Sequence, residues 1–211
     1  LKATGDNSNG IDNSGNVKII SGEISGNLYG IYNNSKDENS GEDVTLTING
    51  GKIIGGHITE KSETEDGETT TYKEYEGAGV YVEGGKLTVN EDATISVSAE
   101  IKTALSAKTE YIEGIPAAVV VNPENEDNPA VILGTIDGHL AIEEGEDDES
   151  SPSTIQQYFG GDSDLSGVEA IYTITGAVFT DEDFVPAGYA YTATENNSFK
   201  VVDTAIAEIN G

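Results

Sequence analysis

Two acidic side chains stand at a spacing that suits calcium binding. Asp162 and Asp164 lie two residues apart in the glycine-rich turn Gly160-Gly161-Asp162-Ser163-Asp164. Carboxylates in such a turn offer the oxygen ligands that Ca²⁺ prefers. The acidic runs 147–149 and 181–183 offer further carboxylates, and a solvated loop is the alternative explanation for all of them. Asp162 and Asp164 are therefore a candidate Ca²⁺ site, and we expect no other cofactor.

Three side chains form a candidate platform for sugar rings. Asp12, Tyr32 and Tyr81 occupy the same position of three repeated segments. Where strand side chains alternate between the two faces, this position faces outward. Two exposed, stacked tyrosine rings there would suit a glycan. The alternative is that a neighbouring segment covers the rings, for which the polar stretch 59–76 is the candidate.

Residue types that enzymes use are present, but no catalytic constellation stands out. His57 and His139 are the only histidines, and each adjoins a glycine without partners for a triad or a zinc site. Paired carboxylates could serve a glycoside hydrolase, yet acidic residues are so abundant that no pair is distinguished. We expect both histidines to lie at the surface or at corners, and we expect no enzymatic activity.

The charge balance argues against some partners. The chain has 211 residues, of which 39 are acidic and 10 are basic, giving a formal net charge of −29. Every basic residue is a lysine, and cysteine is absent. Because Lys and Arg at phosphates supply most nucleic-acid affinity, we expect no nucleic-acid partner. Without cysteine there is no disulfide framework, thiolate metal site or thiol nucleophile.

Two features bear on location. No stretch is apolar for long enough to form a transmembrane helix, so we expect no membrane insertion. Methionine is absent even at position 1. We therefore expect a mature product or a part of a longer protein, whose secretion signal and anchor would lie outside this sequence.

A repeated unit positions these residues. Its copies begin at Gly10, Gly30 and Gly79, and each alternates apolar and polar residues over short stretches bounded by Gly, Asn, Asp or Ser, as strands with one buried face do. The aligned apolar positions are Ile11, Ile31 and Val80; Val17, Leu46 and Leu87; Ile19, Ile48 and Val89; and Ile24, Ile53 and Ile95. Asn13 and Asn33 also align, and stacked Asn side chains can form a hydrogen-bonded ladder. Glycines that could adopt positive φ at sharp corners are Gly22, Gly26, Gly51 and Gly55.

The repeat spacing predicts a parallel β-solenoid. Gly10 and Gly30 are 20 residues apart, which is close to the length of one coil. Insertions at 35–43 and 59–76 lengthen the next copy, which a solenoid tolerates because each corner is a surface loop. Further strands are expected at 117–122, 130–136, 171–179 and 189–202, a helical turn at 153–160, and, as an alternative register, a coil starting near Ala104-Leu105.

The domain organisation follows from this spacing. We expect one β-solenoid domain over 1–203, with its clearest coils at 10–142 and an acidic loop at 143–163. The last coil and closing strands would occupy 164–203, and 204–211 would link to a following module.

The motif Gly-Ile-Tyr-Asn at 30–33, followed by Leu-Thr-Ile-Asn-Gly-Gly-Lys-Ile-Ile-Gly-Gly at 46–56, resembles a known family. It is similar to the coils of pectate-lyase-like right-handed parallel β-helices in large, adhesin-like surface proteins of bacteria. The segments 174–179, 185–189 and 198–202 are similar to the way such regions end. The resemblance implies an all-β, right-handed parallel β-helix of about five coils.

Together these features favour a non-catalytic structural or adhesive module outside the cell or at its surface. Its partners would be a glycan or a host surface protein, besides adjoining modules of the same parent chain. The insertions at 35–43 and 59–76 would form its contact surface. The alternative is a carbohydrate-active β-helix, a polysaccharide lyase or glycosidase, because β-helices often carry such activities. Against it, lysines such as Lys18, Lys52 and Lys86 are scattered and arginine is absent.

Overall fold

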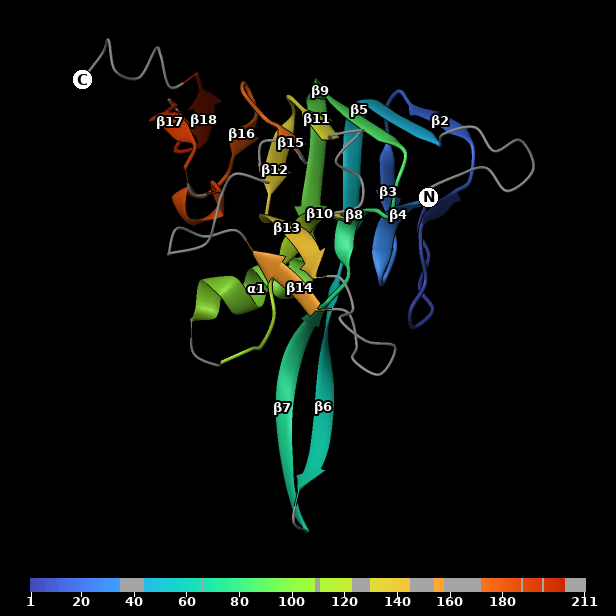
Figure 1. Cartoon of the computed structure of the whole chain (residues 1–211), viewed down its shortest axis with the longest axis vertical. Helices are drawn as coiled ribbons and strands as arrows, with labels where there is room; N and C mark the ends of the chain where they lie inside the picture. The colour runs from blue at the N-terminus through green and yellow to red at the C-terminus, as the bar shows by residue number, and fades with distance from the viewer. Residues whose placement is uncertain are drawn as a thin grey trace.

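The repeated segments form strands that pair with one another from one repeat to the next. The computed structural model describes residues 1–34, 44–65, 67–108, 111–122, 130–144, 154–157, 172–186, 188–194 and 196–203. These residues form two sheets that consist mainly of parallel strands, one α-helix, and a two-stranded hairpin that projects from the body (Figure 1).

The first sheet has six strands, and its first five are parallel and follow chain order. They are β1 (Ile11–Asn13), β4 (Tyr29–Asn33), β8 (Ala78–Val82), β10 (Ala117–Val121) and β13 (His139–Glu144). The sixth, β14 (Thr154–Gln157), pairs antiparallel with β13. The expected helical turn at 153–160 is therefore wrong, because residues 154–157 add a strand to the open edge of β13. The expected acidic loop at 143–163 likewise gives way to strand at 143–144 and 154–157.

The second sheet has ten strands. Its parallel strands are β2 (Asn16–Ile19), β3 (Glu23–Ser25), β5 (Thr45–Gly55), β9 (Lys86–Val97), β11 (Ala130–Ile132), β12 (Thr135–Asp137), β15 (Tyr172–Thr173) and β16 (Val178–Phe179). Two strands, β17 (Ala190–Ala193) and β18 (Phe199–Val202), close the sheet antiparallel. A short 3₁₀ helix (Glu182–Phe184) precedes them. The strands β5 and β9 are long because each pairs with two shorter neighbours in succession.

The strand register confirms the sequence alignment position by position. Ile11 lies opposite Ile31, which lies opposite Val80. The other aligned sets pair in the same way: Val17, Leu46 and Leu87; Ile19, Ile48 and Val89; and Ile24, Ile53 and Ile95. Their side chains form one apolar core shared by both sheets, in which Ile31, Leu46, Ile53 and Ile95 are fully buried. The predicted Asn ladder is also present, since Asn13 Nδ2 donates to Asn33 Oδ1 over 2.8 Å.

The corner glycines serve two different purposes. Gly22 and Gly51 have φ of 98° and 92°, which confirms the expected left-handed corners. Gly26 and Gly55 do not have positive φ, so that part of the expectation is wrong. A Cβ at Gly55 would collide with the carbonyl of Ala78, and one at Gly26 with the carbonyl of Tyr29. These two positions need glycine because another backbone passes too close for any side chain.

Helix α1 (Ala99–Ala107) was not expected, since no segment of this region shows helical periodicity over several turns. It starts where the Ser98 hydroxyl accepts a hydrogen bond from the N–H of Ile101, and it ends at Lys108 in the left-handed conformation. The alternative coil near Ala104-Leu105 is therefore wrong. Residues 117–121 and 130–137 instead continue the strand order after β8 and β9.

Candidate functional site

The hairpin of β6 (His57–Glu65) and β7 (Glu68–Glu76) is the feature that projects furthest from the body (Figure 1). Its strands pair from His57 opposite Glu76 to Glu65 opposite Glu68. The polar insertion at 59–76, expected as a surface loop, is therefore mostly strand, and that expectation is wrong. An Asp-Gly dipeptide at 66–67 between stretches rich in Thr and Tyr is a hairpin signal that could have been used, and Gly67 has φ of 85°.

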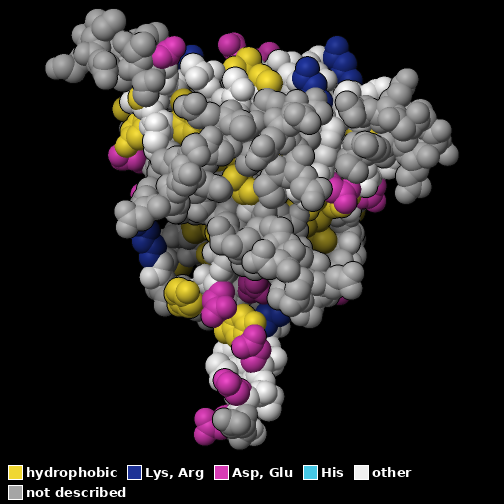
Figure 2. All heavy atoms as spheres, viewed as in Figure 1, with side chains coloured by type: hydrophobic (Ala, Val, Ile, Leu, Met, Phe, Trp, Pro, Cys, Tyr) yellow, Lys and Arg dark blue, Asp and Glu magenta, His cyan; other side chains and the backbone are white. Residues whose placement is uncertain are grey.

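Alternation along the two strands gives the hairpin two unlike faces. One face, here called the acidic face, carries His57, Thr59, Lys61, Glu63, Glu65, Glu68, Thr70, Tyr72, Glu74 and Glu76. The other, here called the hydroxyl face, carries the cross-strand pairs Ser62–Thr71 and Thr64–Thr69, with hydroxyl oxygens 3.4 and 3.1 Å apart. Glu60 lies opposite Lys73 on the hydroxyl face, so the negative and positive charges of this pair balance each other. Figure 2 shows acidic side chains along the projecting hairpin.

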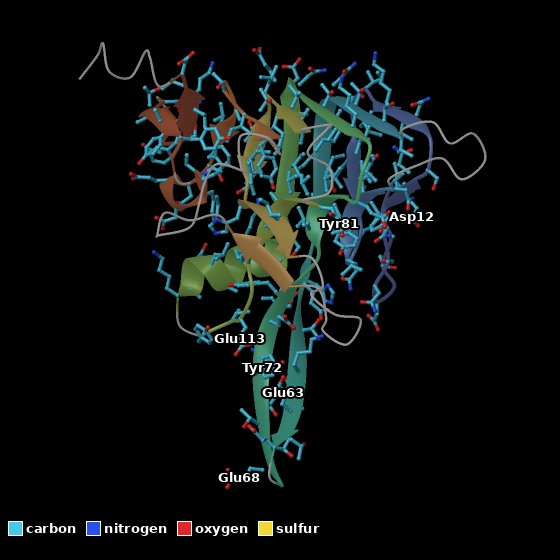
Figure 3. All side chains as sticks on the ribbon, in the orientation of Figure 1. Asp12, Glu63, Glu68, Tyr72, Tyr81 and Glu113 are labelled. Carbon is cyan, nitrogen blue, oxygen red and sulfur yellow. The ribbon has the colours of Figure 1, made fainter. Side chains whose placement is uncertain are left out.

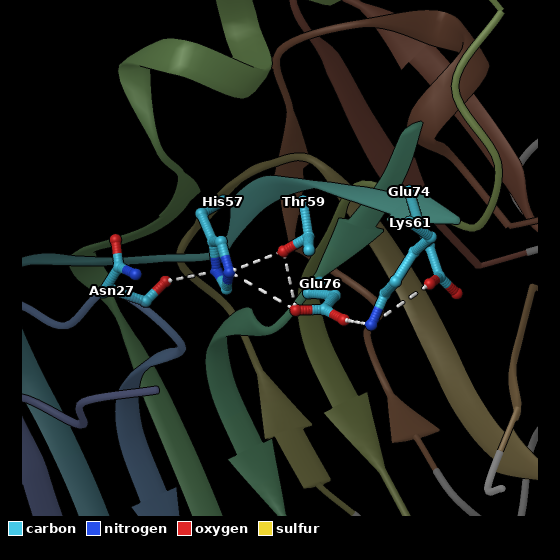
Figure 4. A network of polar contacts seen from close by, with 6 residues as sticks. All are labelled: Asn27, His57, Thr59, Lys61, Glu74 and Glu76. Carbon is cyan, nitrogen blue, oxygen red and sulfur yellow. Dashed lines mark hydrogen bonds and ion pairs between the residues drawn. The ribbon is translucent and has the colours of Figure 1, made fainter. Parts of the chain in front are cut away.

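A polar network ties the base of the acidic face to the body (Figure 4). His57 Nδ1 lies 3.1 Å from the carbonyl oxygen of Asn27, and His57 Nε2 lies 2.9 Å from Thr59 Oγ1. The Thr59 hydroxyl donates to Glu76 Oε2 over 2.8 Å, and the same carboxylate oxygen lies 3.3 Å from His57 Nε2. Because the carbonyl of Asn27 can only accept, Nδ1 carries a proton in this arrangement. The histidine thus anchors the hairpin to the chain at Asn27.

Lys61 completes this network on the hairpin. Its ammonium contacts the carboxylate of Glu76 and lies 3.8 Å from that of Glu74. The hydrogen bond to Glu76 raises the pKa of Lys61. Burial alone would raise the pKa of Glu76, but the hydrogen bonds from Lys61 and Thr59 outweigh it and hold the pKa below its usual range. Both groups therefore stay charged near neutral pH.

Towards the tip, no lysine of the described residues compensates the charges of the acidic face. The Tyr72 hydroxyl donates to Glu63 Oε1 over 3.0 Å. This hydrogen bond raises the pKa of Tyr72, and the charges of Glu63, Glu74 and Glu113 raise it further. Glu65 and Glu68 lie directly opposite each other and are exposed, an arrangement that costs stability. Figure 3 shows Glu63, Tyr72 and Glu68 spread along the hairpin, with Glu113 beside its upper part.

Hollows flank both sides of the hairpin base. The larger, of about 1090 Å³, is lined by the network residues of the hairpin together with Asp6, Tyr29, Tyr75 and Ile115. The smaller, of about 460 Å³, lies between the hairpin and α1 and is lined by Ile58, Lys73, Thr103 and Ala107, among others. Burial raises the pKa of Tyr75. Volumes of this order suit small ligands or extended chain segments.

The predicted tyrosine platform is only partly correct. Asp12, Tyr32 and Tyr81 do lie in register on β1, β4 and β8. Tyr81, however, is only 6% exposed and packs in a second cluster with Ala117, Val120 and Ala141, against which Tyr29, Tyr32 and Ile115 lie. Tyr81 is therefore covered, and the expected exposed platform does not form. The covering residues come from β4 and the segment before β10, whereas the suggested cover was 59–76.

The two histidines differ in environment. His57 is half-buried in the network of the hairpin base, as a corner position would allow. His139 is only 8% exposed and meets the Phe184 ring edge-on at 4.6 Å, so a surface position is wrong for it. Burial lowers the pKa of His139 to about 4, against a smaller opposing effect of the Asp181 charge.

A second polar cluster, missed from the sequence, surrounds Asp137 on β12. Its carboxylate accepts hydrogen bonds from Lys102 on α1, from Thr180 over 2.8 Å and from Ser96 over 3.2 Å. Burial alone would raise the pKa of Asp137, but these hydrogen bonds hold it below its usual range. The ion pair with Lys102 fastens α1 to the second sheet.

The candidate calcium ligands Asp162 and Asp164 lie outside the described residues, so that site stays a prediction. Within the described ranges, no group of three or more Asp, Glu or His side chains is arranged to hold a metal ion. In the same part of the chain, no helix is both long and apolar enough to cross a membrane.

Comparison with known proteins finds no match: no protein family, no curated protein and no solved structure is detectably similar to this chain.

Proposed function

We propose that the chain is a right-handed parallel β-helix of about five coils. Five parallel strands of the first sheet follow chain order, and strands of the second sheet lie between them in sequence. Such an alternation is what a coil that advances by one strand per turn produces. Right-handedness is supported by the strong preference of parallel crossover connections for that hand.

On this scaffold, the chain acts as a non-catalytic structural and adhesive module of a larger bacterial surface protein, outside the cell. The observation that carries this proposal is where the hairpin emerges. It leaves β5 and rejoins the chain at β8, yet Ile53 still lies opposite Ile95 and Ile31 opposite Val80. The repeat thus presents a long arm without disturbing the core, as a display scaffold requires.

The groups at the hairpin base support binding over catalysis. The Thr59 hydroxyl donates to Glu76 Oε2 over 2.8 Å, so it belongs to an ion-paired network. Glu76 is held by Lys61, His57 and Thr59 together. Groups that satisfy one another in this way stiffen an arm.

One observation favours a second candidate, a carbohydrate-active enzyme. The larger hollow is lined by Glu60, Glu74 and Glu76 as well as by tyrosines. Carboxylates across a groove are what a glycoside hydrolase needs. Release of reducing ends, or of unsaturated sugars, from neutral or acidic polysaccharides would establish this activity and overturn the non-catalytic proposal.

Shortening the arm tests the proposed function. Residues 60–73 are replaced by Asn-Gly, so that Thr59 and Glu74, which lie opposite each other, flank a tight two-residue turn. Both chains are applied to an oligosaccharide array and to purified extracellular matrix proteins. We expect the whole chain to bind at least one probe and the shortened chain to bind it at least about tenfold more weakly, which is a loss of about 1.4 kcal/mol.

The control is the thermal unfolding of both chains, which should match because the core lies outside the hairpin. Equal binding by the two chains, or no binding by the whole chain, would contradict an adhesive role for the arm.

A further inference from the structure

The outer edge of β7 already accepts one residue of another segment. Glu113 pairs parallel with Glu74, donating its N–H to the Lys73 carbonyl over 2.8 Å and accepting from the Tyr75 N–H over 2.9 Å. The backbone groups of Lys73 and Tyr75 therefore point away from β6. This edge can form a parallel ladder with an added strand.

The same edge continues unpaired towards the tip. Backbone groups of successive strand residues point to alternate sides, so Thr69 and Thr71 face outward like Lys73. Within the described residues, β7 pairs only with β6 and with Glu113, and both threonines are exposed. A row of unpaired N–H and C=O groups of this kind is a template for another strand.

The side chains beside this edge define the partner's charge. An added strand would place alternate side chains over the acidic face, next to Glu68, Tyr72 and Glu74. Lys61 is the one lysine of that face, and it already contacts Glu74 and Glu76. Within the described residues, Glu63, Glu65 and Glu68 have no lysine partner. A cationic side chain there would find carboxylates and the ring of Tyr72, which also attracts cations.

A second copy of this chain does not fit that surface. The whole chain carries a net charge of −29, and none of its ten lysines lies two residues from another. Two acidic hairpins brought edge to edge would repel each other. The occupant must come from a chain of opposite charge.

We propose that the outer edge of β7, from Glu68 to Lys73, takes up an extended segment of a partner protein as a third strand, with Lys or Arg at alternate positions over the acidic face. This inference rests on the proposed role of the hairpin as the contact arm. Main-chain pairing supplies affinity, and the alternating charges fix the register.

The test uses fluorescently labelled peptides and the whole chain at physiological ionic strength. The first peptide alternates lysine with threonine and is long enough to span Glu68 to Lys73. The second has the same composition with its lysines contiguous. We expect the alternating peptide to bind about tenfold more tightly, because only it can pair its backbone and present all its charges on one face. Equal affinities would show unspecific charge attraction and overturn the proposal.

Two edge variants isolate the backbone contribution. Thr71→Pro removes an outward N–H of β7 without touching the bonds to β6, and Ser62→Pro does the same on the opposite, outer edge of β6. Thr71→Pro should weaken the alternating peptide by at least about tenfold, while Ser62→Pro should change its affinity less than about twofold. The reverse order would overturn the choice of edge.

If proline destabilises the hairpin, a charge variant and amide hydrogen exchange test the proposal instead. Glu68→Gln with Glu74→Gln should weaken binding by about tenfold at most, as expected for two exposed ion pairs. Bound peptide should slow amide exchange at Thr69 and Thr71, but not at Thr70 and Tyr72, whose N–H groups face β6. Unchanged exchange at Thr69 and Thr71 would overturn strand addition.

The outcomes separate this inference from the function on which it rests. If neither peptide binds, yet shortening the hairpin still abolishes binding to array probes, the arm is adhesive and the cationic partner is wrong. If the whole chain instead sediments as a hairpin-dependent dimer, the occupant of the edge is a second copy, which also overturns the proposal.

Discussion

The rings of Tyr32 and Tyr81 stack at a centroid distance of 5.0 Å, with planes 8° from parallel. Tyr29 lies against both, at 5.6 Å from Tyr32 and 4.9 Å from Tyr81. The cluster therefore forms a second, aromatic packing layer outside the first sheet.

This burial predicts a stability effect at Tyr81. Tyr81→Ala should lower the free energy of unfolding by about 3 to 5 kcal/mol, as truncation of a buried aromatic residue does. Tyr32→Ala should cost clearly less, because Tyr32 is half-buried, and Tyr81→Phe should cost about 1 kcal/mol because the ring remains. Urea denaturation measures all three. Equal costs at Tyr32 and Tyr81 would mean that Tyr81 is not covered.

The Asn ladder predicts a similar contrast among amides. Asn33 accepts from Asn13 and donates to the carbonyl of Gly84 over 2.8 Å, and both contacts are buried. Asn33→Ala removes the buried donor of the Gly84 carbonyl and one of two acceptors of Asn13 Nδ2, which still donates to the Thr45 carbonyl over 3.0 Å. It should cost about 2 to 4 kcal/mol, at 1 to 3 for the carbonyl and about 1 for the lost bond of Asn13. Asn90→Ala is the matched control, since its bond to Asn49 Oδ1 is only partly buried. It should cost about 1 kcal/mol in the same denaturation experiment; a larger loss at Asn90 than at Asn33 would argue against the ladder.

The close approach at Gly55 predicts an unusually severe Gly→Ala substitution. Gly55→Ala should destabilise the fold by at least about 2 kcal/mol, because the new methyl group meets the Ala78 carbonyl. At Gly15 no atom lies within 4 Å of an added Cβ and φ is not positive. Gly15→Ala should leave stability unchanged or raise it by up to about 1 kcal/mol. Thermal unfolding of both variants checks this. If Gly55→Ala leaves stability unchanged, β5 and β8 can move apart to accommodate the methyl group.

His139 predicts a pH dependence. Its pKa is lowered from 6.5 to about 4 in the folded chain, so the unfolded chain binds a proton more readily between these values. The histidine's contribution is fully present above pH 6.5 and is lost as the pH falls towards 4, by about 1.4 kcal/mol per pH unit. Lower pH also relieves repulsion among the carboxylates, so the measurement is the difference between the wild type and His139→Phe. The difference in unfolding free energy, wild type minus His139→Phe, should rise in favour of the histidine from pH 4 to pH 6.5 and stay constant above pH 6.5. A difference that is already constant from pH 4 to pH 6.5 would contradict burial of His139 as the cause.

The sequence predicted the parallel strands well because their signal is local and periodic. Ile11, Ile31 and Val80 mark the same inward position in segments bounded by the same turn residues, so aligning them also gives the strand register. The predictions failed where contacts between distant segments, and not the local sequence pattern, determine the structure. Residues 154–157 form a strand because they pair with the edge strand β13, and no local sequence pattern predicts that pairing. Tyr81 is buried because Tyr32 and Val120 lie opposite it on the two neighbouring strands and Tyr29 and Ile115 pack against the same cluster.

The candidate site was harder to predict for a related reason. Residues 59–76 are polar on both faces, so no apolar alternation marks them as strands. The contact of Thr59 with Glu76 depends on pairing across the hairpin, and that of His57 with Asn27 depends on the coil below. Such a network emerges only from the folded geometry.

The two strands of the arm enter the body at different places, and this has a mechanical consequence. β6 continues from β5, a central strand of the second sheet, while β7 leads into β8, which lies between β4 and β10 in the first sheet. Tension applied at the arm's tip is therefore divided between both sheets. The force acts along the length of β5 in one sheet and of β8 in the other. Many hydrogen bonds between neighbouring strands must then break together instead of one at a time. An arm rooted in this way can transmit a strong pull to the scaffold without unravelling it.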